Sequence, residues 1–321
     1  MAFTDEQPFL DAIFARYHDD GPRLVYADYL DAVGDPDRAE LVRVQLALAR
    51  MTEEHPRRPE LTERKAELLA ANGARWTEHL RDLGAVAHFR RGVMDEVVME
   101  AAAFLENGEE LFRRIPVRRL ALRNDTGVMP KLIQTPLLAR LRELDLCGND
   151  LGNGGAALLV RSPYLKELVE LDLGSNGLDD AGVEVLARSS TFPALTALSL
   201  NNNDQITSAG LILLAESPFF AGLTTLDVWG NDITDAGVRA VAASPSCARL
   251  HTFNISGNPI GDGGVGALAG SALLRRILAR TPRLELRKCE IGAAGVSALV
   301  ASPTLDLSLI FMMQWGRIRC L

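Results

Sequence analysis

Apolar and polar positions alternate in a short pattern that recurs along the chain. In one copy Leu141, Leu144 and Leu146 are separated by polar residues, and Asn149 follows three positions later. A period of two predicts a β-strand with its leucines on one face and its polar residues on the other. Further copies of the pattern begin at Leu168, Leu195, Leu223 and Leu250.

A helical pattern follows each strand pattern. Within Asp179–Ser189, Val183 and Leu186 recur at the spacing of one helix face, and similar segments follow the other copies. A proline after serine, as at Pro218, predicts the end of a helix because the residue before proline avoids the α region. The chain is therefore predicted to alternate one strand with one helix.

An asparagine closes the turn after each predicted strand. A buried amide at this place can bond the backbone of neighbouring turns and satisfy groups that would otherwise lack partners. We therefore interpret the row as structural and not as a binding row. Its members are Asn149, Asn176, Asn203, Asn231 and Asn258.

The repeat length is almost constant. The first leucines of successive copies are 27, 27, 28 and 27 residues apart. A fixed period of roughly 20–50 residues indicates a stacked repeat protein. The spacing L-x-x-L-x-L-x-x-N-x-L is typical of leucine-rich repeats, and residues 117–303 resemble their ribonuclease-inhibitor-like subclass. The predicted fold is α/β: a right-handed leucine-rich repeat solenoid, or horseshoe, with a parallel inner sheet and outer helices, preceded by a small all-α module.

Segments without a clear repeat flank the regular copies. Arg283–Ile291 is a late copy with Cys289 in place of the asparagine. Before the repeats, apolar patterns predict helices at Phe9–Tyr17, Val25–Val33, from Pro36 onward and at Leu61–Leu83, then a strand at Val93–Met99 and a helix at Ala101–Arg113. We divide the chain into a helical module (1–85), an N-terminal cap of the solenoid (86–116), the repeats (117–303) and a degenerate C-terminal cap or tail (304–321).

The helical module resembles a known family. The pattern P-R-L-V-Y-A-D-W-L, then G-D-P, then A-E-x-x-R-x-Q is matched by Pro22–Leu30, Gly34–Pro36 and Ala39–Gln45, with Tyr29 where tryptophan is usual. The segment is similar to the repeat-companion domain of planctomycete-type bacteria, a short helical module that precedes leucine-rich or other repeats. The resemblance implies this architecture and a bacterial origin, and it implies no activity.

Composition and motifs narrow the functional classes. A net charge of −8 over 321 residues disfavours nucleic acid as a partner, because proteins that bind nucleic acid are usually basic. No apolar run approaches the roughly 20 residues that span a bilayer, and the first residues lack the pattern of a secretory signal. The four cysteines are scattered, and no histidine stands in a catalytic or metal motif, so we interpret His88 and His251 as packing or surface residues. We expect a cytoplasmic, non-enzymatic protein without cofactor, metal site or membrane partner.

The polar positions between the leucines offer candidate binding residues. They form an acidic stretch in the first two repeats, with one large aromatic residue further along. Aspartate at this place is frequent in the repeat subclass, so the acidic residues are either a feature of the repeat or a docking lane for a basic or mixed-charge protein. The candidates are Trp229, Asp227, Glu143, Asp145, Glu170, Asp172, Asn201 and Asn254.

Two functions remain open from the sequence. The first is a protein–protein interaction scaffold that binds a partner on the concave sheet surface, with the helical module as a tether or oligomerisation element. The second is a regulatory activator of a small GTPase, because proteins similar to this repeat subclass include Ran GTPase activators. No residue here maps onto the rim asparagine of those activators. A GTP-hydrolysis assay would separate the two, and the sequence sets no oligomeric state.

Overall fold

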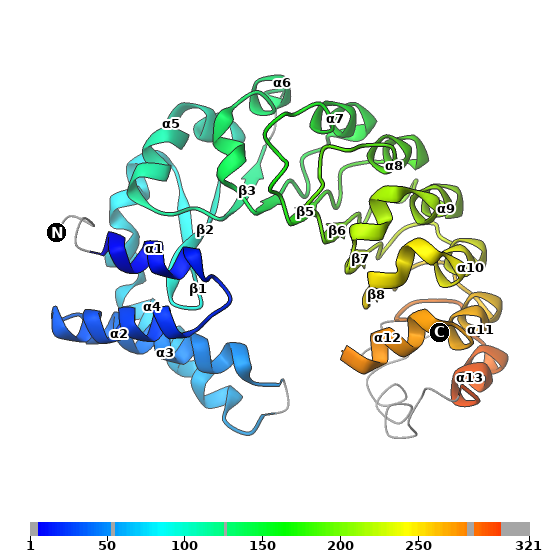
Figure 1. The fold of residues 1–321 in the computed structure, drawn as a ribbon, viewed down its shortest axis with the longest axis horizontal. Coiled ribbons are helices and arrows are strands. Elements are labelled where there is room, and N and C mark those ends of the chain that lie inside the picture. The colour runs from blue at the N-terminus through cyan, green and yellow to red at the C-terminus, as the bar shows by residue number, and fades with distance from the viewer. Residues whose placement is uncertain (1–5, 53–54, 125–126, 281–285, 303–321) are drawn as a thin grey trace. The chain divides into compact units, whose positions relative to one another are not determined.

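The computed structural model describes residues 6–52, 55–124, 127–280 and 286–302 (Figure 1). The chain divides into two compact units, an N-terminal unit (Met1–Ala121) and a solenoid unit (Leu122–Leu321). The proposed C-terminal cap, residues 304–321, lies outside the described residues.

The N-terminal unit opens with a helical module. Its elements are α1 (Gln7–Ala15), α2 (Gly21–Ala32), α3 (Pro36–Arg50), α4 (Arg58–Thr77) and the 3-10 helix η2 (Glu78–Leu83). The helices predicted from the apolar stripes are confirmed. Gly34 ends the second of them with a φ of 85°, a left-handed conformation that favours glycine.

A hairpin and a further helix complete this unit. Strand β1 (Val86–Arg90) pairs antiparallel with β2 (Val93–Glu100), which is followed by α5 (Ala101–Arg114) and β3 (Arg119–Arg123). The predicted strand and helix correspond to β2 and α5. Strand β1 was not predicted from the sequence.

The helical module packs directly on this hairpin. Gln45 of α3 donates from Nε2 to the Phe89 carbonyl at 3.0 Å and accepts the Gly92 amide at 2.7 Å. A Cβ at Gly92 would lie only 2.7 Å from Cγ1 of Val42, so the hairpin turn meets the helix without room for a side chain. Val93 shares one apolar core with Leu10, Ile13, Tyr26, Leu30, Val42 and Leu46.

A second polar link joins the module to β2. The Tyr17 hydroxyl donates to Oδ2 of the buried Asp95 at 2.6 Å. The Tyr17 ring lies 4.7 Å from the guanidinium carbon of Arg23 and 3.9 Å from that of Arg118. Arg23 is fully buried and donates to the carbonyls of Tyr17 and Asp19, so it fixes the turn between α1 and α2. Helices α1–α3 of the module and the following hairpin are therefore joined by specific buried contacts.

The solenoid unit repeats one strand and one helix. Its strands β4 (Glu143–Asp145), β5 (Glu170–Asp172), β6 (Ala197–Ser199), β7 (Thr225–Asp227) and β8 (Thr252–Asn254) pair in parallel in chain order. Figure 1 shows helices α7–α11 in a row along one side of these strands. The helices of the unit are α6 (Met129–Leu132), α7 (Gly152–Leu159), α8 (Asp180–Ala187), α9 (Ser208–Glu216), α10 (Asp235–Ala243), α11 (Asp262–Ala269), α12 (Ala272–Arg280) and α13 (Ala293–Val300). Between them lie the 3-10 helices η3 (Pro136–Arg140), η4 (Pro218–Gly222) and η5 (Pro245–Arg249).

The strand register matches the sequence prediction. The central apolar residue of each strand faces the core and pairs with its equivalent in the next strand. None of these residues is more than 3% exposed. The column is Leu144, Leu171, Leu198, Leu226 and Phe253.

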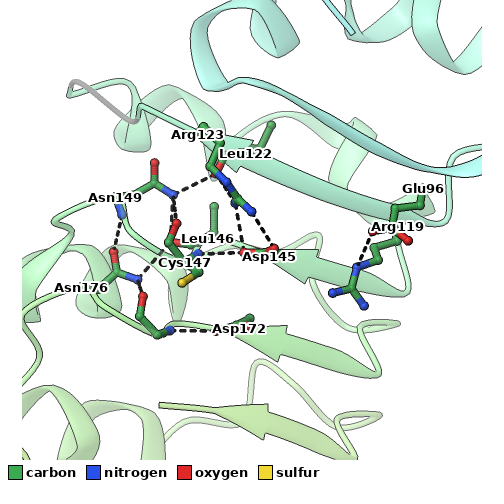
Figure 2. A network of polar contacts seen from close by, with 11 residues as sticks. Glu96, Arg119, Leu122, Arg123, Asp145, Leu146, Cys147, Asn149, Asp172 and Asn176 are labelled. Carbon is green, nitrogen blue, oxygen red and sulfur yellow. Dashed lines mark hydrogen bonds and ion pairs between the residues drawn. The ribbon is translucent and has the colours of Figure 1, made fainter. Parts of the chain in front are cut away.

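The asparagines form the structural ladder that the sequence predicted. Asn203 donates from Nδ2 to the carbonyls of Leu173 and Leu200, and its Oδ1 accepts the amides of Asn176 and Leu178. Figure 2 shows the corresponding contacts of Asn149 and Asn176. Cys289 takes the next place, buried with its Sγ 3.7 Å from the Ile255 carbonyl. The ladder satisfies buried backbone groups, and we assign it no binding role.

A second ladder runs along the helix N-termini, and the sequence did not predict it. Oδ1 of Asp180, the first residue of α8, accepts the amides of Thr207 and Gly210 of the next repeat at 2.8 and 2.9 Å. A Cβ at Gly210 would lie 2.4 Å from that oxygen, so the glycine allows the helices to approach. Asp235 and Asp262 accept the amides of Gly261 and Gly292, the equivalents of Thr207 in the following repeats. The recurrent D-A-G or D-G-G triplet is therefore a linkage between neighbouring helices.

Candidate docking surface on the parallel sheet

The polar positions of β4–β8 form two aligned rows. Each residue pairs with its equivalent in the next strand, as the sequence alignment of the repeats predicted. The first row is Glu143, Glu170, Ala197, Thr225 and Thr252, and the second is Asp145, Asp172, Ser199, Asp227 and Asn254. Adjacent strands lie about 4.8 Å apart, so the carboxylates of the second row span about 14 Å.

Residues of the second row also shape the local backbone. Oδ1 of Asp145 accepts the amide of Cys147, two positions later, at 2.9 Å. The same bond recurs from Asp172 to the amide of Gly174, from Asp227 to that of Trp229 and from Asn254 to that of Ser256. Aspartate and asparagine favour this turn because their short side chains reach the backbone two residues on. The acidic row is thus at least partly a structural feature of the repeat.

The charge of Asp145 is balanced by an arginine. Arg123 donates from Nη1 to Oδ1 at 3.1 Å and from Nη2 to Oδ2 at 2.9 Å, a two-bond geometry visible in Figure 2. Hydrogen bonding to Asp145 raises the pKa of Arg123 above its ordinary value. Because two-bond contacts between arginine and carboxylate are strong and directional, Asp145 is less available to a partner than its row position suggests.

Burial further restricts the first two repeats. Glu143 is only 9% exposed, although its row position predicted an outward-facing carboxylate. Glu170 and Asp172 are half-buried. The accessible carboxylates are therefore fewer than the sequence indicated.

Burial raises the pKa of the neighbouring Cys147 thiol, and the charges of Asp172 and Asp145 act in the same direction, so the thiol stays neutral near pH 7.

Trp229 lies at the edge of an open pocket. Its side chain is half-buried, and it lines a cavity of about 340 Å³ together with Asn254, Ser256, Arg287 and Lys288. The indole extends toward the next repeat. Its Nε1 would lie only 3.0 Å from a Cβ atom if Gly257 carried a side chain. The Trp229 side chain is therefore only partly accessible: one part packs on the following repeat and the rest borders the cavity.

Asn201 and Asn254 differ in how their amides are used. Asn254 donates from Nδ2 to Oδ2 of Asp227 at 3.3 Å, which joins two candidate residues. Oδ1 of Asn201 is buried and accepts no hydrogen bond within the described part of the chain. The geometry therefore brings Asp227, Trp229 and Asn254 together, whereas Glu143 and Asp145 occupy more enclosed positions at the first strand. The binding role of all eight candidates stays a prediction.

The comparisons with known proteins address the class of the fold. The family described as "Leucine Rich repeat" matches six segments, residues 140–160, 165–187, 193–215, 223–242, 246–269 and 283–300. These segments include β4–β8 and the helices that follow them. These six segments of the solenoid unit are therefore leucine-rich repeats. No curated protein matches the chain.

Two solved structures are similar to parts of this chain. The C-terminal domain of tropomodulin from Caenorhabditis elegans is 15% identical over 51% of this chain and 99% of that domain, with a TM-score of 0.34. An internalin, InlF, from Listeria monocytogenes is 18% identical over 64% of this chain and 62% of its own, with a TM-score of 0.36. The assignment of the repeats rests on the family match and the strand register.

The remaining expectations concern membranes and metals. None of the helices in the described residues combines the length and apolar character that crossing a membrane requires. Among those residues, no group of three or more histidine, cysteine, aspartate or glutamate side chains is arranged to hold a metal ion.

Proposed function

We propose that the solenoid unit is an interaction scaffold that binds a protein partner on the polar face of strands β4–β8. The observation that carries the proposal is the half-buried Trp229 beside an open cavity. Most strand-face positions of these repeats are small or acidic, so a large aromatic side chain here is not required by the repeat. Tryptophans that border pockets often dominate binding energy at protein interfaces.

The charges around Trp229 favour a partner of mixed charge. Asp227 lies on β7, in the repeat of Trp229, and Asp172 lies on the earlier strand β5. Arg287 and Lys288 come later in the chain and line the cavity. Complementary charge on the two sides of an aromatic anchor fixes the direction in which a partner binds and accelerates encounter. A segment with a basic end toward Asp172 and an acidic end toward Lys288 matches this order.

The finer assignments are part of the same proposal. We assign residues 1–85 as a repeat-companion module and the repeats as ribonuclease-inhibitor-like. The first rests on the matches at Pro22–Leu30, Gly34–Pro36 and Ala39–Gln45. Gln45 of this pattern is buried and bonds the hairpin, and the buried Arg23 holds the turn between α1 and α2, which supports a structural role for the pattern within its own unit.

A random peptide library displayed on phage tests the docking surface and requires no identified partner. Peptides selected on the full chain should bind Trp229→Ala about 30-fold more weakly, which corresponds to about 2 kcal/mol. Leu213→Ala is the matched control, because Leu213 is 37% exposed on helix α9. Both variants should stay folded and melt in a single cooperative transition. Peptides that bind Trp229→Ala as well as the wild type would contradict the proposed surface.

A further inference from the structure

The repeat that follows β8 departs from the regular length. Its ladder residues Asn258 and Cys289 are 31 residues apart, whereas earlier ladder residues are 27 or 28 apart. The additional length lies in α12, a helix of 9 residues that stands where preceding repeats have the 5-residue 3-10 helices η4 and η5. Insertions within single repeats of a solenoid often contribute to binding.

Helix α12 holds an arginine against the preceding repeat. Arg276 donates from Nη2 to the Cys247 carbonyl at 2.9 Å and from Nε to the Leu250 carbonyl at 3.4 Å. A guanidinium carries five N–H donors, so these bonds fix its plane and leave further donors for a ligand. Among the described residues, no carboxylate forms an ion pair with Arg276. The cation is therefore oriented by neutral carbonyls and keeps its charge uncompensated.

Arg276 lines an open pocket together with a second arginine. The pocket has a volume of about 320 Å³ and is lined by Thr224, Ala248, Arg249, His251, Arg276 and Ala279. None of these side chains is acidic, although the whole chain has a net charge of −8. Arg249 is exposed, and within the described part of the chain it forms no ion pair. No sequence pattern predicted this cluster, because its members come from η5, α12 and the residues that precede β7 and β8.

We propose that this pocket, the Arg249–Arg276 pocket, binds a phosphate monoester. Two guanidinium groups with free N–H donors match the several oxygens and the charge near −2 of a phosphate group. Guanidinium is the side chain best suited to bind phosphate through two bonds at once. The phosphate belongs either to a free phosphorylated molecule or to a phosphorylated side chain of a protein. The site shares no residue with the docking surface at Trp229, so it does not depend on that proposal.

Titrations at constant ionic strength test the site on the full chain. The probes are inorganic phosphate, the peptide acetyl-Gly-phosphoserine-Gly-amide and its unphosphorylated form. The readout is the arginine Nε–Hε signals in ¹⁵N NMR, with calorimetry for affinity. Phosphate should bind saturably and shift the Arg276 signal. Arg249→Gln and Arg276→Gln should each weaken binding about tenfold or more, the effect of losing a charge-assisted hydrogen bond.

Arg275→Gln is the matched control, because Arg275 is exposed on the same helix and does not line the pocket. It removes the same charge and should leave binding unchanged. Arg249→Gln keeps the test decisive if Arg276→Gln disturbs the fold, because the described structure gives the Arg249 side chain no hydrogen bond to lose. The proposal would be overturned if neither inorganic phosphate nor the phosphopeptide bound saturably, or if Arg275→Gln weakened binding as much as Arg249→Gln and Arg276→Gln do. Tighter binding of the phosphopeptide than of phosphate would identify a phosphorylated side chain as the ligand, and equal binding would show that the pocket recognises the phosphate group alone, as in a free phosphorylated molecule.

Discussion

The two units of the chain satisfy their buried polar groups in different ways. In the solenoid unit, one contact is repeated: Asn176 and Asn203 use the same amide atoms toward equivalent backbone groups, one repeat apart. In the N-terminal unit, the contacts of Gln45 with the hairpin and of Tyr17 with Asp95 each occur once. Repeated contacts leave a period in the sequence, whereas contacts that occur once leave only isolated residues.

This difference predicts how the two units respond to damage. A solenoid repeat contacts mainly its neighbours. The loss of one ladder residue should therefore destabilise the adjacent repeats and leave distant repeats unchanged. The N-terminal unit has one shared core for helices α1–α3 and the start of β2. Damage to a contact there should loosen the helical module and the hairpin together. The following substitutions test this comparison, from the largest expected effect to the smallest.

Leu198→Ala should have the largest effect. Leu198 is 1% exposed and lies in the middle of the inner column. Replacing a buried leucine with alanine costs about 2–5 kcal/mol, because it removes apolar contacts and leaves a cavity. Denaturant melts should show this loss, and Leu213→Ala on the exposed side of α9 should show little. A stability equal to that of the wild type would contradict the register.

Gln45→Ala should cost about 2 kcal/mol or more, because the Phe89 carbonyl and the Gly92 amide would lose their partners. Hydrogen exchange should accelerate in both the helical module and the hairpin of the N-terminal unit. The control is Gln134→Ala, an exposed glutamine of the solenoid unit. Faster exchange confined to α3 would show that the module and the hairpin are not one cooperative structure.

Asp180→Ala tests the ladder at the helix N-termini. It removes the acceptor for the amides of Thr207 and Gly210, and we expect a loss of about 1 kcal/mol, as for other helix-cap residues. Exchange should accelerate at the start of α9 and not in α11. The matched control is Asp204→Ala, because Asp204 is an exposed aspartate between α8 and α9. Equal effects of the two substitutions would contradict the claim that Asp180 stabilises the start of α9.

Asp179→Asn should have the smallest effect at neutral pH and a clear effect in acid. Hydrogen bonds from the Ala181 amide and the Asn153 side chain lower the pKa of Asp179 in the folded chain. Stability from this group is therefore present above its unfolded pKa of about 3.9 and is lost as the pH falls toward the folded value. The variant keeps an acceptor oxygen but does not titrate.

Urea melts at about pH 7 and about pH 3 measure the effect of Asp179→Asn. The variant should lose less stability on acidification than the wild type does. Asp204→Asn is the control, because Asp204 is exposed in the corresponding loop of the next repeat, between β6 and α9. An identical loss in Asp179→Asn and the wild type would mean that the contacts of Asp179 do not favour its ionised form.

The sequence predicted most of the solenoid unit because its determinants are periodic. Leu144, Leu171 and Leu198 mark the register, and the row of asparagines marks the turns. The helix linkage through Asp180 was missed although related triplets recur at the starts of other helices, as at Asp235–Gly237. A triplet at a helix start has an ordinary local explanation, and only the structure shows that its carboxylate reaches the next repeat.

The candidate site was only partly predictable for a related reason. A row position indicates which face a side chain occupies, but it does not show what the side chain contacts there. The burial of Glu143 and the contact of Arg123 with Asp145 depend on neighbours in other repeats. The Arg249–Arg276 pocket depends on an inserted helix and has no periodic signal at all.

The central claim is that the polar face of β4–β8, around Trp229, receives the partner. Hydrogen exchange of the full chain with and without a selected peptide tests it most directly, because protection locates the bound segment without any substitution. The account predicts slower exchange in residues 225–230 and 252–257, with helices α8–α10 unchanged. Protection of those helices instead, with no change in the strands, would contradict the account.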